Sequence, residues 1–314
     1  MSSGVRPFFV GKSLLVLFVV CGIASLQLAC GGGSGTNGTS ITVQTPAPAG
    51  QLTFSHVVLL VEENHSYSEV IGNSSMPYLN SLASKYGLAT EYFADGHPSI
   101  PNYFVLTTGL PETVDDNFSG TISDDNVVRE LVKAGKTWKS YTESLPSPGY
   151  LGANSGFYLR RHNPFTYLSD VQNDATQAAN IVPFTQFATD LANDALPQYS
   201  FVTPNTMDDA HNGTLAEADA WLQTNIPPLL ANAAFQKSGL LIITFDEGAQ
   251  SDIDHVGGHV ATLIISSAAK PGFQSKNVYQ HQSVLRLTLA GSGLTTLPGL
   301  SGVAPDMTEF FNGH

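Results

Sequence analysis

The stretch HVVLLVEENH, residues 56–65, sets an uninterrupted apolar run directly before two acids, an amide and a histidine. A continuous run of this length is typical of a strand that is buried on both faces. A second run, LLIITF at residues 240–245, has the same character and is followed by Asp246-Glu247-Gly248. The sequence therefore predicts two buried strands that each end in a pair of acids.

Shorter segments of strand and helix character alternate along the rest of the chain. Strand-like runs lie at residues 137–141, 199–202 and 259–266. Helical patterns lie at residues 76–86, 124–135, 184–192, 215–234 and 283–290, and Pro227-Pro228 is expected to interrupt the longest of them. The alternation predicts an α/β fold with a mostly parallel central sheet and helices on both faces. Ligands of such sheets bind outside the carboxyl ends of the strands.

The beginning of the chain has the composition of an export signal. Arg6 and Lys12 give it a positive start, and the apolar run at residues 14–20 is short for a membrane span. Residues 1–29 are therefore expected to direct export and to lie outside the folded domain.

Cys30 follows Leu28-Ala29 and precedes three glycines, a pattern that resembles the lipobox of bacterial lipoproteins. The alternative is ordinary cleavage near Ala29. Residues 30–50 are rich in Gly, Ser, Thr and Pro and are expected to form a flexible tether, which leaves residues 51–314 as a single domain. We expect an exported protein that meets the membrane through a lipid on Cys30 and stays in the cell envelope. Otherwise it is secreted or periplasmic.

The chain is strongly acidic once the predicted signal is removed. Of the 13 basic residues, Arg6 and Lys12 belong to the signal, so 11 remain against 26 acidic residues, a formal charge of −15. Such a surface repels nucleic acid and anionic membranes, so nucleic acid is not expected as a partner. A phosphorylated substrate would need a local cation, from a metal or from histidines. The solubility of a secreted protein would also explain the acidity.

The acids after the two buried strands are candidate metal ligands. Neighbouring side chains of a regular strand point to opposite faces, but beyond the end of the strand both members of a pair can turn inward. Four oxygen donors, from Glu63, Asn64, Asp246 and Glu247, would then converge on one divalent cation. The commoner fate of a single acid pair is a loop position or a helix cap. Two pairs after the two most buried strands favour the metal site, from which Glu62 is left out.

Several motifs, in order along the chain, resemble the phosphoesterase family of bacterial acid phosphatases and phospholipases C. They are Glu63-Asn64-His65-Ser66, His97-Pro98-Ser99-Ile100-Pro101-Asn102-Tyr103, His162-Asn163-Pro164-Phe165, Asp246-Glu247-Gly248, Gly257-Gly258-His259-Val260 and Tyr279-Gln280-His281-Gln282-Ser283-Val284-Leu285-Arg286. Together they span roughly residues 55–294 and are specific, although each alone is weak. The resemblance implies an alkaline-phosphatase-like fold, one bound divalent metal cation and a phosphorylated-enzyme intermediate. It also implies metal ligation by Glu63, Asn64, Asp246 and Glu247, with Ser99 as the fifth ligand.

Ser99 is the candidate nucleophile. It lies just before Pro101, which suits the first turn of a helix that continues toward Leu106. A serine at this place would ordinarily cap the helix. The same backbone donors also favour an anion, here the transferring phosphoryl group, and a bound cation would lower the pKa of the hydroxyl. The resemblance places the nucleophilic Ser or Thr of the family at this position.

Three histidines are candidates for contact with the substrate. His162, His211 and His259 lie in polar or glycine-rich segments that are expected to form loops at strand ends. They would bind phosphoryl oxygens or protonate the leaving oxygen. A structural or surface role is the alternative for each of them. Asp208 and Asp209, close to His211, would also complete the pocket, and which of these residues does so stays open.

The combined interpretation is an acid-phosphatase-like hydrolase that acts on small phosphoric monoesters through a phosphoserine. A phospholipase C or another phosphodiesterase is the first alternative. Phospholipases of the family usually carry further C-terminal domains, and the serine nucleophile fits the phosphatases better. A non-catalytic surface lipoprotein is the second alternative, and it would not require Ser99 together with two acid pairs.

Overall fold

The two predicted buried strands lie side by side inside one eight-stranded sheet, β1 (His56–Glu62) next to β6 (Gly239–Phe245). The computed structural model describes residues 52–313. The strand order is β4-β3-β5-β1-β6-β7-β2-β8, and every neighbouring pair is parallel except the two that β7 makes. The other strands are β2 (Gly87–Phe93), β3 (Trp138–Thr142), β4 (Ile181–Pro183), β5 (Tyr199–Thr203), β7 (Thr262–Ile265) and β8 (Gln274–Gln280).

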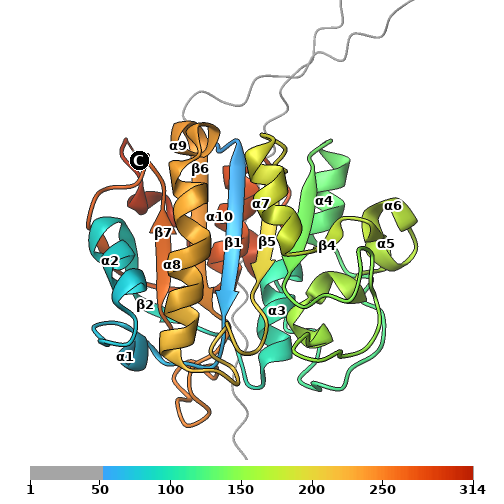
Figure 1. Ribbon diagram of the computed structural model, residues 1–314, viewed down its shortest axis with the longest axis horizontal. Helices are drawn as coiled ribbons and strands as arrows, with labels where there is room; N and C mark the ends of the chain where they lie inside the picture. Colours follow the sequence, from blue (N-terminus) through green and yellow to red (C-terminus); the bar gives the residue numbers. More distant parts are fainter. Residues whose placement is uncertain (1–51, 314) are drawn as a thin grey trace, which may run out of the picture. The chain divides into compact units, whose positions relative to one another are not determined.

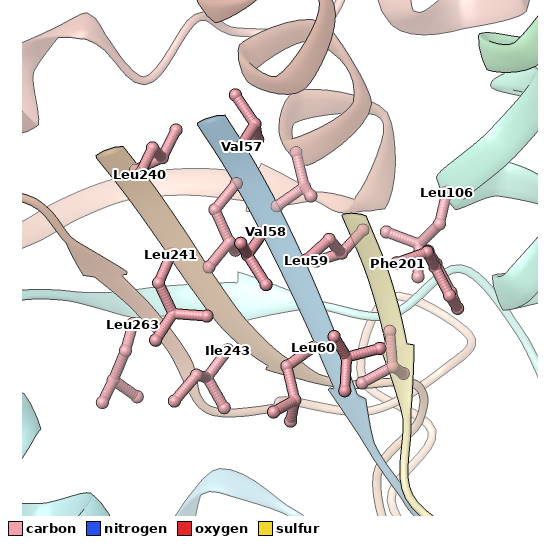
Figure 2. Close-up of a cluster of buried hydrophobic side chains, with 14 of the residues drawn as sticks. Val57, Val58, Leu59, Leu60, Leu106, Phe201, Leu240, Leu241, Ile243 and Leu263 are labelled. Atoms are coloured by element: carbon pink, nitrogen blue, oxygen red, sulfur yellow. The ribbon is translucent and has the colours of Figure 1, made fainter. Parts of the chain in front are cut away.

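The apolar runs fill the centre of this sheet. Side chains of β1 and β6 project from both faces, between Phe201 of β5 and Leu263 of β7 (Figure 2). Val57 to Val61 are almost wholly buried, as are Leu240 to Ile243. A strand covered on both faces needs apolar side chains at every position, which is why these two runs do not alternate.

Helices cover both faces of the sheet, as predicted (Figure 1). In front of the sheet in that view lie α8 and α7, and α2 contacts α8. On the other face α10 packs against α3, and both contact α4. The helices are α1 (Tyr67–Val70), α2 (Pro77–Lys85), α3 (Ser99–Thr108), α4 (Val127–Lys133), α5 (Ser169–Gln172), α6 (Ala175–Ala178), α7 (Thr185–Ala192), α8 (Leu215–Ala231), α9 (Ala233–Ser238) and α10 (His281–Gly291), with short 3-10 helices η1 (Arg160–His162), η2 (Pro164–Tyr167), η3 (Gly299–Gly302) and η4 (Thr308–Phe310).

The expected interruption of the long helix at its two prolines is wrong. Helix α8 runs through Pro227 and Pro228 and ends at Ala231. The two carbonyls that lose their intrahelical donor belong to Gln223 and Thr224, and both residues are exposed. Water can therefore bond these carbonyls, while Leu222, Ile226 and Leu229 hold the opposite side of the helix in the core.

Three strands lacked a clear signal in the sequence. The edge strand β8 reads QSKNVYQ and is largely exposed, so it carries no apolar run. β2 begins directly after α2, and β4 has three residues. The strand predicted at residues 259–266 is confirmed at Thr262–Ile265, and it is antiparallel to both neighbours.

The predicted export signal, tether and lipidated Cys30 lie outside the described residues, so the domain boundaries stay predictions. Among the described helices, none combines the length and the apolar character that a membrane span requires.

Candidate active site

Glu63 is the centre of the polar cluster at the carboxyl end of β1. It is fully buried, and its backbone N–H bonds the carbonyl of Asp209 at 2.9 Å. One carboxylate oxygen, Oε2, accepts from Ser99 Oγ at 3.2 Å and from Asn64 Nδ2 at 3.0 Å. The other, Oε1, accepts from the hydroxyl of Tyr103 and lies 3.3 Å from His162 Nε2. Both oxygens of this acid therefore have fixed positions.

Asn64 joins the end of β1 to the end of β6. Its φ of 60° lies in the left-handed region, which asparagine adopts more readily than most residues. Its backbone N–H donates to Asp246 Oδ1 at 3.0 Å, and the N–H of Glu247 donates to the same oxygen at 2.7 Å. Asp246 Oδ2 is buried and has no hydrogen-bond partner. One carboxylate oxygen is thus positioned by two donors while the other remains available.

Ser99 begins α3, with Pro98 as the N-cap residue and Gly109 as a left-handed C-cap. The helix is buried at every position, and the exposed fraction of Ser99 is 2%. The Ser99 hydroxyl bonds Glu63 and also contributes hydrogen bonding that favours the charged forms of Asp246 and Glu247. The predicted nucleophile therefore lies among the predicted metal ligands.

Glu247 is held by His97, which lies two residues before Ser99. His97 Nδ1 lies 2.7 Å from Glu247 Oε2, and His97 Nε2 lies 2.8 Å from the carbonyl oxygen of Asp252. A carbonyl only accepts, so Nε2 carries the hydrogen. The contact with His97 therefore fixes the direction of the Glu247 carboxylate.

His162 lies inside the cluster, on η1. It is buried, its ring stacks on Tyr103 with centroids 5.2 Å apart, and Nδ1 lies 3.6 Å from Asp209 Oδ2. Burial lowers the pKa of His162 well below its usual value, and the charges of Arg161 and His211 lower it further. At neutral pH this ring is therefore neutral and adds no positive charge to the cluster.

His211 lies at the border of the cluster, half-buried, with its ring centroid 5.5 Å from that of His162. Arg161 Nη2 lies 3.0 Å from His211 Nε2, and His211 Nδ1 lies 2.9 Å from Asn212 Oδ1. A guanidinium only donates, so Nε2 is the acceptor and Nδ1 carries the hydrogen. Arg161 thereby fixes the tautomer of His211.

His259 is not brought into contact with Ser99 or the acid pairs. Its Nε2 lies 2.9 Å from the carbonyl oxygen of Thr90, and its ring stacks on Tyr67 with centroids 4.4 Å apart. Its described contacts suit a structural role at the start of the segment that leads to β7. His281 is also structural in its contacts, because it links Tyr92 to the carbonyl oxygen of Asp246 at 2.7 Å.

Burial raises the pKa of four acids at this site, and the charge of Asp246 adds to the effect at Glu63, Asp209 and Glu247. Burial raises the pKa of Glu63 well above its usual value, and the charges of Asp246 and Asp209 add to the effect. Burial, Asp246 and Asp116 raise the pKa of Glu247 to about 9. Burial also raises the pKa of Asp209 well above its usual value, and the charge of Asp246 adds to the effect. We call Glu63, Asp209, Asp246 and Glu247 the acidic cluster. Its members would ionise together only with a cation among them.

The residues present fit a divalent cation. The donors of the predicted set are carboxylate, amide and hydroxyl oxygens, which hard cations prefer, and the unpartnered Asp246 Oδ2 is available as a ligand. A second group overlaps with it, because ligand atoms of Glu63, His162 and His211 lie within 4.8 Å of one another. Arg161 donates to the lone pair of His211 Nε2, so this nitrogen is not free to ligate a cation. The oxygen-rich set is therefore the better candidate.

Sequence reasoning gave no role at this site to Tyr103, His97 or Arg161, and it left open which of Asp208, Asp209 and His211 completes the pocket. Tyr103 is one helical turn after Ser99, a spacing that brings side chains together on α3. His97 lies two residues before Ser99, but its contact with Glu247 spans 150 residues and that of Arg161 with His211 spans 50, so no local pattern signals either contact.

Comparison with known proteins agrees with this geometry. The model of the phosphoesterase family matches residues 73–291. A phosphatidylinositol-3-phosphatase of Mycobacterium tuberculosis is 34% identical over 263 residues, which are 82% of this chain and 83% of the relative. An acid phosphatase of Aspergillus fumigatus is 34% identical over 245 residues, 75% of this chain but 54% of the relative. The chain therefore spans about half the length of that fungal relative.

Solved structures with low sequence identity share the fold. A protein in the alkaline phosphatase superfamily from Vibrio parahaemolyticus superposes with a TM-score of 0.55 at 16% identity, over 77% of this chain and 67% of that one. The lipoteichoic acid synthase of Listeria monocytogenes gives a TM-score of 0.58 at 11% identity, over 81% and 76% of the two chains. These likenesses confirm the alkaline-phosphatase-like fold and nothing beyond it.

Proposed function

This chain belongs to the phosphoesterase family and is a phosphoric-ester hydrolase, and we propose that it cleaves phosphoric monoesters through a phosphoserine at Ser99 with one divalent cation. The observation that supports this most is the position of Ser99. It is a buried hydroxyl at the start of a helix, 3.2 Å from Glu63 and among the acids that follow two neighbouring strands. A structural cap would not require this acidic cluster around it.

The first half of the proposed reaction transfers the phosphoryl group to the enzyme. Ser99 Oγ attacks phosphorus, its hydrogen passes toward Glu63 Oε2, and the bond from phosphorus to the ester oxygen breaks. The N–H groups of the first turn of α3 face the phosphoryl oxygens and favour their negative charge. The released alcohol takes up one proton.

The second half returns the enzyme to its starting state. Water attacks the phosphorus of phosphoserine, the bond to Ser99 Oγ breaks, Oγ takes back the proton that Glu63 held, and inorganic phosphate leaves with the hydrogens of the water. His162 Nε2 lies 3.3 Å from Glu63 Oε1, the carboxylate oxygen that Ser99 does not bond, and Asp209 lies 3.6 Å from the other ring nitrogen of His162. A cation held by Glu63, Asn64, Asp246 and Glu247 would lower the pKa of the Ser99 hydroxyl and offset the charge of the acids.

The names of the relatives favour monoesters over diesters. A phosphatidylinositol-3-phosphatase and acid phosphatases both remove a phosphate that has one ester bond. The phosphodiester alternative is retained as the competing substrate class in the assay.

Ser99→Ala is the decisive variant. We expect the kcat for p-nitrophenyl phosphate to fall at least about a thousandfold, because no other residue replaces the attacking oxygen. Acid quenching of the wild type should trap phosphate on Ser99, which peptide mass spectrometry would locate. Ser283→Ala is the matched control, since Ser283 is buried at the start of α10 and its hydroxyl has no partner. A folded Ser99→Ala protein with turnover near that of the wild type would refute the phosphoserine mechanism.

A further inference from the structure

Beyond the N–H groups of α3 and the proposed cation, the acidic cluster offers the proposed substrate no partner for its negative charge. A monoester carries up to two charges on its phosphoryl oxygens, and one divalent cation must also offset the surrounding carboxylates. The part of the chain that the structure describes holds 11 basic residues. Most of those with described contacts are engaged elsewhere: Arg129 with Asp170, Lys133 with Glu130, Lys139 with Asp190, Arg160 with Thr166, Lys270 with a backbone carbonyl of η4 and Arg286 with that of Ala304.

Arg161, by contrast, lies at the border of the acidic cluster. Its side chain is 17% exposed and bonds His211 at the border of the cluster. Its charge lowers the pKa of His162 and of Glu247, so it lies within electrostatic range of both sides of the cluster. Its Nε is buried without a hydrogen-bond partner, 3.4 Å from Asp116 Oδ2.

Asp116 occupies a place where an anion would bind. Its Oδ1 accepts from the backbone N–H of Ile100 at 3.4 Å, in the first turn of α3 and next to Ser99. Its Oδ2 faces Arg161. A helix N-terminus and a guanidinium are the two groups that most often bind phosphate in proteins. Both distances are long, and the Asp116 side chain is 30% exposed, so a better-placed anion can replace this carboxylate.

We propose that Arg161 binds the non-bridging oxygens of the substrate's phosphoryl group in place of Asp116, and that it makes the site prefer monoesters over diesters. This inference rests on the proposed function. A monoester dianion offers the guanidinium one more negative charge than a diester does, so the arginine adds more to monoester binding. His211 is the positioning residue for Arg161, because its Nε2 lone pair fixes one end of the guanidinium.

The adjacent arginine supplies a matched control. Arg160 bonds the Thr166 side chain at 3.3 Å and lies over the Tyr167 ring, 4.2 Å from its centroid. It has the same charge and the same 3-10 helix as Arg161 but no contact with the cluster. Arg161→Gln and Arg160→Gln therefore change the net charge equally and separate binding at the site from a general loss of positive charge.

The test compares p-nitrophenyl phosphate with bis-p-nitrophenyl phosphate in the holoenzyme. For Arg161→Gln we expect kcat/KM for the monoester to fall roughly 10- to 100-fold, the value of a charge-assisted contact, and kcat/KM for the diester to fall less than about threefold. The inhibition constant of inorganic phosphate should rise in parallel with the monoester effect. Arg161→Lys should recover part of the loss, because it keeps the charge without the planar fork.

Asp116→Asn tests whether Asp116 competes with phosphate for Arg161. Removing the competing carboxylate should lower the inhibition constant of inorganic phosphate by about two- to fivefold, the range of a partly exposed ion pair. Equal losses on monoester and diester, or an unchanged inhibition constant in Arg161→Gln, would overturn the role of Arg161. An increase in that constant in Asp116→Asn would overturn the replacement of Asp116. A wild type without turnover on either ester would instead refute the proposed function.

Discussion

The two strands that carry the acid pairs end differently. β1 includes its first acid, Glu62, whereas β6 stops at Phe245, before both of its acids. In the register of the sheet Glu62 lies opposite Phe245. Asp246 and Glu247 both contribute to the acidic cluster, but of the first pair Glu63 alone does so. Glu62 is buried with both carboxylate oxygens unpartnered.

The difference shows that the last paired residue of a strand decides where an acid pair points. A residue still within the pleat keeps the strand's alternation, so Glu62 and Glu63 face opposite ways. Burial raises the pKa of Glu62, as do the charges of Asp209, Asp208, Asp219 and Glu143. Identical side chains, one residue apart, therefore have different surroundings and different expected roles.

The largest expected effect belongs to Asp246, the acid with a free buried oxygen. Asp246→Asn removes one charge and the carboxylate oxygen that is best placed to ligate a cation. We therefore expect kcat/KM for p-nitrophenyl phosphate to fall at least about a thousandfold. Calorimetric titration of Mn²⁺ into chelator-treated protein should show weaker binding in the variant. Asp190→Asn, away from the cluster in an ion pair with Lys139, is the control. Unchanged cation affinity in Asp246→Asn would contradict the proposed ligand set.

A smaller effect is expected from pH on the cation-free protein. The folded pKa of Glu247, about 9, exceeds its unfolded value of 4.5, so the folded chain holds a proton that the unfolded chain has lost. That contribution to stability is complete below the unfolded pKa, is lost steadily as pH rises above it, and is gone once pH has passed the folded pKa. The Tm should therefore fall roughly 5–10 °C between about pH 6 and about pH 8.

Added Mn²⁺ should reduce this fall, because the ionised carboxylates then bind the cation. Calorimetric scans with chelator and with Mn²⁺ measure both curves. A Tm of the cation-free protein that rises over this interval would show that the acids are already ionised in the folded state.

The smallest effect is expected at Glu62. Glutamine has the same shape as the neutral acid, so Glu62→Gln should change kcat/KM less than about threefold and Tm by no more than about 3 °C. Glu63→Gln, the neighbouring change, should lose most of the activity. Similar losses in the two variants would place Glu62 in the same site and remove the distinction between the strand ends.

Much of the sheet was predictable because its central strands are buried on both faces. That condition leaves Glu62 and Thr244 as the buried polar positions of β1 and β6, and the apolar runs in the sequence are unmistakable. β8 gave no such signal, since an exposed edge strand is held by backbone hydrogen bonds that any side chain permits. The continuous α8 was missed because the exposure of Gln223 and Thr224, not the prolines alone, decides whether the helix survives.

The candidate site was predictable where it follows strands and motifs. Glu63, Asn64, Ser99, Asp246, Glu247 and His162 come together as expected, whereas His259 has its contacts elsewhere. A histidine in a glycine-rich loop looks the same in sequence whether its ring meets a substrate or a backbone carbonyl. Arg161 and His97 depend on tertiary contacts that span 50 and 150 residues, which a single sequence does not encode in any local pattern.

The reversed direction of β7 has a consequence for how the protein can vary. Because β7 is antiparallel to β6, the segment between them leaves and returns at the same edge of the sheet, and Gly248 N–H bonds Gly257 O at 2.8 Å across its base. Such a closed loop can change length at a cost of only about 0.6 kcal/mol per doubling, without moving either strand. Residues 253–256, which include the exposed Ile253 and Val256, can therefore diverge, whereas Asp252 is held in place because its carbonyl accepts from His97.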